Sequence, residues 1–125
     1  MNAATPALQR FWQALRVYTP GNDMHVRHSS RLERFATKAI RLGAEILEVE
    51  YKDGYEVIFA AKGAFGVGIG RLRSTGSAAA ELRQELARCT RHKRRIVVEG
   101  CTYELRGRVY DSFGEQAYQV VLRRV

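Results

Sequence analysis

The sequence predicts an α+β fold, a mostly antiparallel six-stranded sheet with helices packed on it. First, a helix followed by three short strands occurs over 30–73 and again over 77–124, after one earlier helix. Second, the strand segments alternate apolar and polar residues. Third, both units share a serine at the helix start, a Tyr-Glu-apolar start to the middle strand, and Phe-Gly after it. This internal repeat predicts that the two units superimpose about a pseudo-symmetry axis.

Length and composition fit one domain spanning 1–125. The chain has 125 residues, 46% hydrophobic and 27% charged, as in an ordinary globular protein with a core. No apolar stretch approaches a membrane span, and the N-terminal sequence MNAATPALQR lacks a signal-peptide pattern. Cys89 and Cys101 are too few for a disulfide framework. We therefore expect a cytoplasmic protein with no membrane association.

Two helices are expected before the first strand. Thr5 and Pro6 start the first, over 6–18, because a capping side chain and a first-turn proline favour initiation. Its apolar face consists of Leu8, Phe11, Trp12, Leu15 and Tyr18. Ser30 and Glu33 form a capping box for the second helix, and Gly43 ends it. The buried stripe of the second helix consists of Leu32, Phe35, Ala36, Ala39 and Ile40.

The first unit continues with a hairpin and a glycine-rich strand. Asp53-Gly54 is a strong two-residue turn. We expect the following inward-facing residues on its two strands: Leu47, Val49, Tyr51, Tyr55, Val57, Phe59 and Ala61. Gly66, Gly68 and Gly70 would share one face of the third strand and leave a trough. We expect Phe11 or Trp12 to fill it, since large groups fill the space beside small ones; the alternative is a ligand or a nucleic-acid backbone.

The second unit repeats this order with a more basic sequence. Its helix follows Ser77, with Ala79, Leu82, Leu86 and Cys89 inward. Turns at Glu99-Gly100 and over 111–114 separate its three strands. The chain has a net charge of +8 and a pI near 10.0, and residues 71–125 hold twelve Lys/Arg against six Asp/Glu, or +6. Such a positive charge favours a polyanionic partner.

The candidate phosphate-binding residues form two groups. The first surrounds the end of the third helix and consists of Arg88, Arg91, Lys93, Arg94 and Arg95. The second is one face of the last two strands and consists of Arg106, Arg108, Tyr110 and Arg123. Arginine forms bidentate phosphate contacts, and a tyrosine among arginines can stack on a base. The alternatives are a helix end that complements its dipole and an ordinary solvated sheet face.

The sequence contains four candidate metal ligands, but we expect no metal site. His25-x-x-His28 and Cys89-x-x-His92 have spacings that zinc accepts. Cys89, however, has the same inward register as Leu86, where a cysteine behaves as a small hydrophobe. We expect no metal and no cofactor, although the sequence does not decide whether these four residues bind one.

Two partial resemblances concern the order of elements. The segment KGAFGVGIGRLRSTGSAAAELRQELA resembles the end of a double-stranded-RNA-binding domain, whose glycine-rich third strand leads into its second helix. That family grips phosphate with lysines at the start of this helix, and here those positions are 77–80, Ser-Ala-Ala-Ala. The order of elements is also similar to that of secretion chaperones, which are typically acidic. Neither resemblance carries a specific motif.

These observations predict a small, non-enzymatic protein that binds DNA or RNA mainly through phosphates. No nucleophile elbow, Walker loop or buried carboxylate pair indicates an enzyme. One alternative is a protein-interaction or adaptor module that forms a homodimer through a flat surface at Ile58, Ala60 and Gly68. Another is a small-molecule binder in the cleft between the first helix and the sheet. Sequence specificity and pathway are not indicated.

Overall fold

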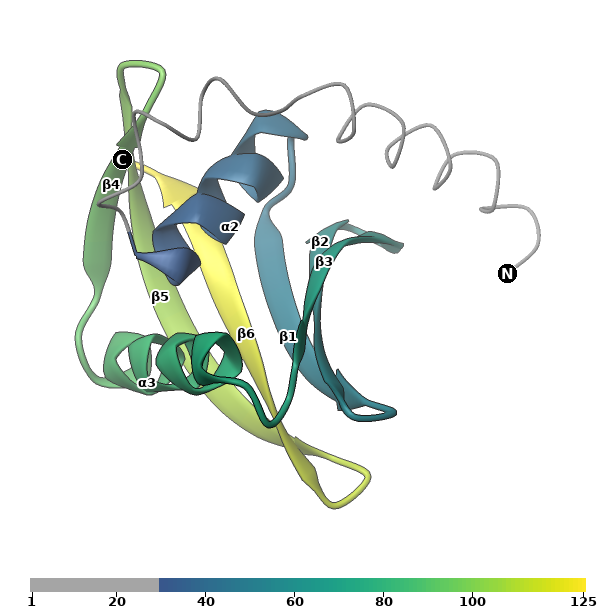
Figure 1. Cartoon of the computed structure of the whole chain (residues 1–125). Helices are drawn as coiled ribbons and strands as arrows, with labels where there is room; N and C mark the ends of the chain where they lie inside the picture. The colour runs from purple at the N-terminus through teal and green to yellow at the C-terminus, as the bar shows by residue number, and fades with distance from the viewer. Residues whose placement is uncertain (1–29) are drawn as a thin grey trace.

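A computed structural model describes residues 30–125 as two helices and a six-stranded antiparallel sheet (Figure 1). This confirms the predicted α+β class. The elements are α2 (Arg31–Arg41), β1 (Ile46–Lys52), β2 (Tyr55–Lys62), β3 (Phe65–Arg73), α3 (Ser77–Arg91), β4 (Arg94–Val98), β5 (Cys101–Ser112) and β6 (Glu115–Arg124). The predicted helix over 6–18 and the expected contacts of Phe11 and Trp12 lie outside the described residues.

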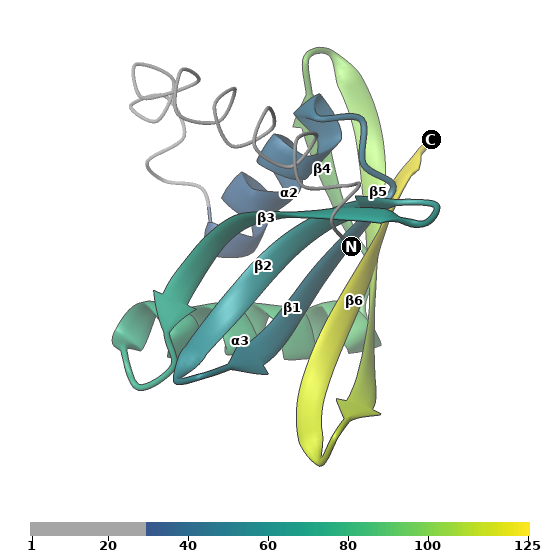
Figure 2. The ribbon, with the colours of Figure 1, turned by 90° about the vertical axis from the view of Figure 1, so that its right-hand side faces the viewer.

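The sheet has the order β3-β2-β1-β6-β5-β4, and every neighbouring pair is antiparallel. It curves into a half-barrel, and α2 and α3 both lie on its concave side, which we call the inner face (Figure 1). The opposite, outer face is seen in Figure 2, where α3 lies behind the strands. The β1–β6 pairing joins the two three-stranded units into one sheet.

The predicted pseudo-symmetry between the two units is not present. Each unit is a helix followed by a meander, but the first unit places its first strand at the centre of the sheet and the second places its last strand there. Superimposing β4, β5 and β6 on β1, β2 and β3 would reverse the strand directions. The rotation that reverses the strands and keeps their order also turns the sheet over, so it would place the helices of the two units on opposite faces. In the structure, α2 and α3 lie on the same face. The similarity is therefore one of element order alone.

Local signals explain where α2 begins and ends. The Ser30 hydroxyl accepts a hydrogen bond from the Glu33 amide at 3.1 Å, which forms half of the predicted capping box. The Glu33 carboxylate bonds instead to an arginine described below. At the other end Gly43 has φ +82°, and Ala44 N–H donates to the Ala39 carbonyl at 3.0 Å, as in a Schellman motif.

The core lies between the two helices and the inner face. The predicted inward residues of α3, which are Ala79, Leu82, Leu86 and Cys89, are all buried. Helix α3 packs so closely on β5 that a Cβ atom at Gly107 would lie 3.1 Å from the backbone of Cys89 and Thr90. Glycine at this position is what allows that close approach.

The predicted facing of β2 is wrong. The two-residue turn pairs Lys52 with Tyr55, and this register places Ile58 and Ala60 opposite Val49 and Leu47 on the inner face. The outward residues are those expected to be inward: Tyr55, Val57, Phe59 and Ala61. Ile58 and Ala60 are 0% and 3% exposed, so two of the three residues proposed for a flat homodimer surface lie in the core.

The three glycines of β3 do not form one trough. The register shifts between Ile58, which pairs with Gly70, and Phe59, which pairs with Gly68, so Ile69 is an extra residue. This bulge leaves Gly66 and Gly68 on the outer face and turns Gly70 to the inner face. A Cβ atom at Gly70 would lie 2.8 Å from the Phe35 ring of α2. Among the described residues, the aromatic ring that packs on Gly70 is therefore Phe35 of α2.

Candidate nucleic-acid interface

The structure divides the first predicted group of cations among three places. Arg88 and Arg91 are exposed and, by helical spacing, lie on the side of α3 opposite Leu82 and Leu86. They point away from the sheet, and neither makes an ion pair within 30–125. Helix-dipole compensation accounts for their position near the C-terminus of α3.

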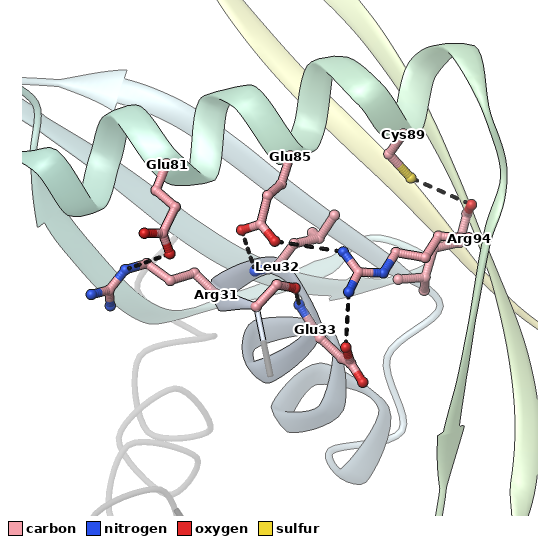
Figure 3. Close-up of polar contacts among 9 residues, drawn as sticks. Arg31, Leu32, Glu33, Glu81, Glu85, Cys89 and Arg94 are labelled. Carbon is pink, nitrogen blue, oxygen red and sulfur yellow. Dashed lines mark hydrogen bonds and ion pairs between the residues drawn. The ribbon is translucent and has the colours of Figure 1, made fainter. Parts of the chain in front are cut away.

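Arg94 lies between the helices and the sheet, where it bridges two carboxylates (Figure 3). Its guanidinium is 2.9 Å from Glu33 of α2 and 3.5 Å from Glu85 of α3. The Glu85 side chain is only 5% exposed and also accepts a hydrogen bond from the backbone amide of Leu32, at 3.2 Å. Glu85 thus caps the first turn of α2 from another helix, and Arg94 supplies the charge that this buried carboxylate needs. We therefore assign Arg94 a structural role in docking α2 on α3.

The remaining cations join the second predicted group on the outer face. Glu104 of β5 lies between Arg95 of β4 and Arg123 of β6 in the register. Its carboxylate is 3.8 Å from Lys93 and 4.0 Å from Arg95, and its side chain is 12% exposed. Arg106 follows two residues later on the same face.

We call Lys93, Arg95, Arg106 and Arg123 the β4–β6 basic zone. Its four cations surround one largely covered carboxylate, and the Lys93 and Arg95 side chains remain 53% and 68% exposed. Arg106 and Arg123 are exposed and have no ion pair with any carboxylate that the structure describes. This zone therefore has a positive excess that can reach an external anion.

Arg108 and Tyr110 have partners within the sheet. Arg108 donates to the Gln119 side-chain oxygen at 2.8 Å, and Gln119 donates to Glu48 at 3.3 Å. The Tyr110 side chain lies beside Glu48 and Glu50. Burial and these two carboxylates raise the pKa of Tyr110, with burial the larger cause. The tyrosine thus lies beside carboxylates instead of standing free as a stacking platform.

We call Glu48 and Glu50 the acidic strip. Both project from the outer face of β1, next to β6 and near the centre of the sheet. The strip separates the β4–β6 basic zone from β2 and β3. A phosphate above β1 would meet negative charge, so the outer face is not a uniform polyanion platform.

Sequence reasoning missed a second group of outer-face cations, at Lys52, Arg71 and Arg73. Arg71 and Arg73 lie over the Tyr55 ring, with their guanidinium carbons 4.4 and 5.6 Å from its centroid. Lys52 pairs with Tyr55 from the other side in the register. The signal that could have found them is the Arg-x-Arg pattern at the end of β3. The bulge, which that pattern does not reveal, places both arginines on this face.

The two candidate metal ligands within the described residues, Cys89 and His92, are not brought together. The Cys89 thiol is buried and donates to the Leu105 carbonyl at 3.4 Å, whereas His92 is exposed at the end of α3. Burial raises the pKa of Cys89, against smaller opposing effects of the Gly107 backbone and Arg94. His25 and His28 lie outside the described residues. Within 30–125 no group of three or more His, Cys, Asp or Glu side chains could hold a metal ion.

Comparison with known proteins adds no relative. No family model matches the chain, and neither a curated protein nor a solved structure shows significant similarity to it. In the part of the chain that the structure describes, neither helix has the length and apolar character needed to cross a membrane. Any inference about function therefore depends on the geometry of the outer face.

Proposed function

We propose that this protein binds DNA or RNA, without catalysis, through phosphate contacts on the outer face of β4, β5 and β6. The observation that carries the proposal is the β4–β6 basic zone, where Lys93, just before β4, and one arginine from each of three consecutive strands surround one carboxylate. Arginine side chains on a sheet face present several donors to phosphate oxygens. We include a cytoplasmic location in the proposal; both cysteines are free, as expected in a reducing compartment.

The proposal assigns unequal roles to the predicted residues. Arg106 and Arg123 are the main phosphate ligands, because neither is neutralised by an ion pair within 30–125. Lys93 and Arg95 assist them while sharing Glu104. Arg108 can turn from Gln119 toward a nearby phosphate. Tyr110 is left out of base stacking because two carboxylates lie beside its hydroxyl.

The test compares two double variants that remove the same charge from opposite sides of the protein. Arg106→Ala/Arg123→Ala alters the outer face, and Arg88→Ala/Arg91→Ala alters the exposed side of α3. Each is titrated with labelled single- and double-stranded oligonucleotides at several salt concentrations. We expect the outer-face variant to bind every sequence more weakly. Its salt-dependence slope should fall by about 1.4 for single strands and about 1.8 for duplexes, for two lost phosphate contacts.

The matched variant separates the possible results. A small change in Arg88→Ala/Arg91→Ala supports the outer face as the interface. A larger loss in that variant than in Arg106→Ala/Arg123→Ala would move the interface to α3. Failure of the wild-type protein to bind either form at low salt would overturn the nucleic-acid proposal itself. Circular dichroism of each variant confirms that the fold is retained.

A further inference from the structure

The outer face carries a second cationic group that the proposed interface does not use. We call Lys52, Arg71 and Arg73, together with the Tyr55 ring that they surround, the β2–β3 basic zone. The two guanidinium carbons lie 4.4 and 5.6 Å from the centroid of one ring. None of the three cations has an ion pair with a carboxylate among residues 30–125.

Two guanidinium groups over one ring repel each other, and the ring offsets only part of that repulsion. An oxyanion that reaches both groups would accept hydrogen bonds from them and reduce the repulsion. The ring itself is covered by Arg71, so it is not open for a base to stack on. The chemistry of this zone therefore favours a phosphate over a nucleobase.

The acidic strip lies between the two basic zones. In the sheet order, β5 and β3 are separated by β6, β1 and β2. Four strand spacings of about 4.8 Å separate the zones by about 20 Å across the strands. Arg106 lies in the row of Ile46 and Arg73 in the row of Lys52, so the zones are also offset by about 20 Å along the strands and lie about 28 Å apart on the outer face. Glu48 and Glu50 project from β1 within this interval. Glu50 pairs with Val57 of β2, which pairs with Arg71 of β3, so the two carboxylates lie on the same face of the sheet as Arg71. A continuous run of phosphates lying flat across β1 would be repelled at its middle.

We propose that a nucleic acid contacts this protein in two separate phosphate segments, one on the β4–β6 basic zone and one on the β2–β3 basic zone. This inference rests on the proposed function. A strand advances about 3.4 Å per phosphate in a duplex, so a distance of about 28 Å corresponds to about eight phosphates. The phosphates between the two segments bridge over the acidic strip. Binding therefore depends on oligonucleotide length, because only a long enough strand engages both zones.

The test measures affinity against length. Wild type and Arg71→Gln/Arg73→Gln are titrated with single strands of about 3 and about 16 nucleotides, the shorter being unable to reach both zones. We expect the short strand, which occupies one zone at a time, to bind the variant at most about twofold more weakly, because the β4–β6 basic zone remains. We expect the long strand to bind the variant at least about tenfold more weakly, with a salt slope lower by about 1.4. Arg34→Gln/Lys62→Gln removes two charges away from the outer face and serves as the matched control.

Each result bears on one of the two proposals. If the variant binds the long strand as wild type does, with an unchanged slope, the two-segment interface is wrong. If the proposed function still holds, Arg106→Ala/Arg123→Ala will weaken binding in that same experiment. An equal loss in the Arg34→Gln/Lys62→Gln control would show that net charge alone sets the affinity and would also overturn the two-segment interface. Absence of wild-type binding to either strand would instead overturn the proposed function.

Discussion

The Tyr110 side chain of β5 lies close enough to Glu48 of β1, two strands away across β6, for this carboxylate to help raise the pKa of the tyrosine. The residue opposite Tyr110 on β6 is Ala117, whose small side chain leaves room for the ring to cross. Glu50 raises the pKa of the same hydroxyl. One neutral phenol thus lies beside two carboxylates of like charge at the join between the two strand units.

Replacing Tyr110 with Phe should destabilise the protein by about 1 kcal/mol, because Glu48 and Glu50 lose a neighbouring hydroxyl that can donate to a carboxylate. The pKa of Tyr110 is raised in the folded protein. Its contribution to stability is therefore complete below the unfolded tyrosine pKa of about 10 and is lost as the pH rises through the folded value. Urea unfolding of both proteins from pH 8 to about pH 11 should show less alkaline loss in Tyr110→Phe. Parallel curves would contradict the raised pKa of Tyr110.

Replacing Gly107 with Ala should destabilise the fold by about 1–3 kcal/mol, because the new methyl group meets the α3 backbone and not a movable side chain. Gly66→Ala is the matched control. Its Cβ atom would have only ordinary contacts, at 3.9 Å, with Ala60 and Ala61. Denaturant midpoints of the two variants should differ clearly, and equal midpoints would show that α3 does not pack on β5 as closely as described.

Replacing Arg94 with Ala should cost about 1–3 kcal/mol of stability. The change leaves the Glu85 carboxylate, 5% exposed, with the Leu32 amide but without a cation. Arg94 itself is 37% exposed, which keeps the expected cost below that of a fully buried pair. Arg88→Ala, on the exposed side of α3, should change stability by no more than about 0.5 kcal/mol. A similar cost for both substitutions would contradict the structural role of Arg94.

The two thiols should react at different rates. Cys89 is 3% exposed with a raised pKa, so little thiolate is present and the reagent has little access. Cys101 at the start of β5 is partly exposed. A disulfide reagent at neutral pH should label one thiol rapidly in the native protein, and Cys101→Ser should abolish this rapid phase. Denaturant should then release the second thiol. Rapid labelling in Cys101→Ser would show that α3 opens readily.

The sequence predicted the elements of residues 30–125 because their signals are local. Capping by Ser30, the Gly43 stop and the Asp53-Gly54 turn each act over a few residues, and each appears in the structure. The apolar periodicity of α3 gave its buried face correctly. The alternation along β5 also predicted that Arg106 and Arg108 share a face, which the β5–β6 register confirms.

Tertiary structure decided the features that depend on pairing between distant segments. Strand β2 is apolar on both faces, so alternation alone could not show that Ile58 is inward and Phe59 outward. The Arg94 bridge required α2, α3 and β4 to meet, and no spacing along the chain reveals such a meeting.

The largest difference between sequence and structure comes from one extra residue in β3. Local alternation places Gly66, Gly68 and Gly70 together and would turn Arg71 to the opposite face. The bulge at Ile69 reverses that alternation, so Gly70 receives the Phe35 ring and Arg71 joins the outer face. The sequence by itself thus determined the helices, strands and turns, because they follow from neighbouring residues. The face that each side chain occupies was decided by strand register, since a shift of one residue exchanges the two sides of a sheet.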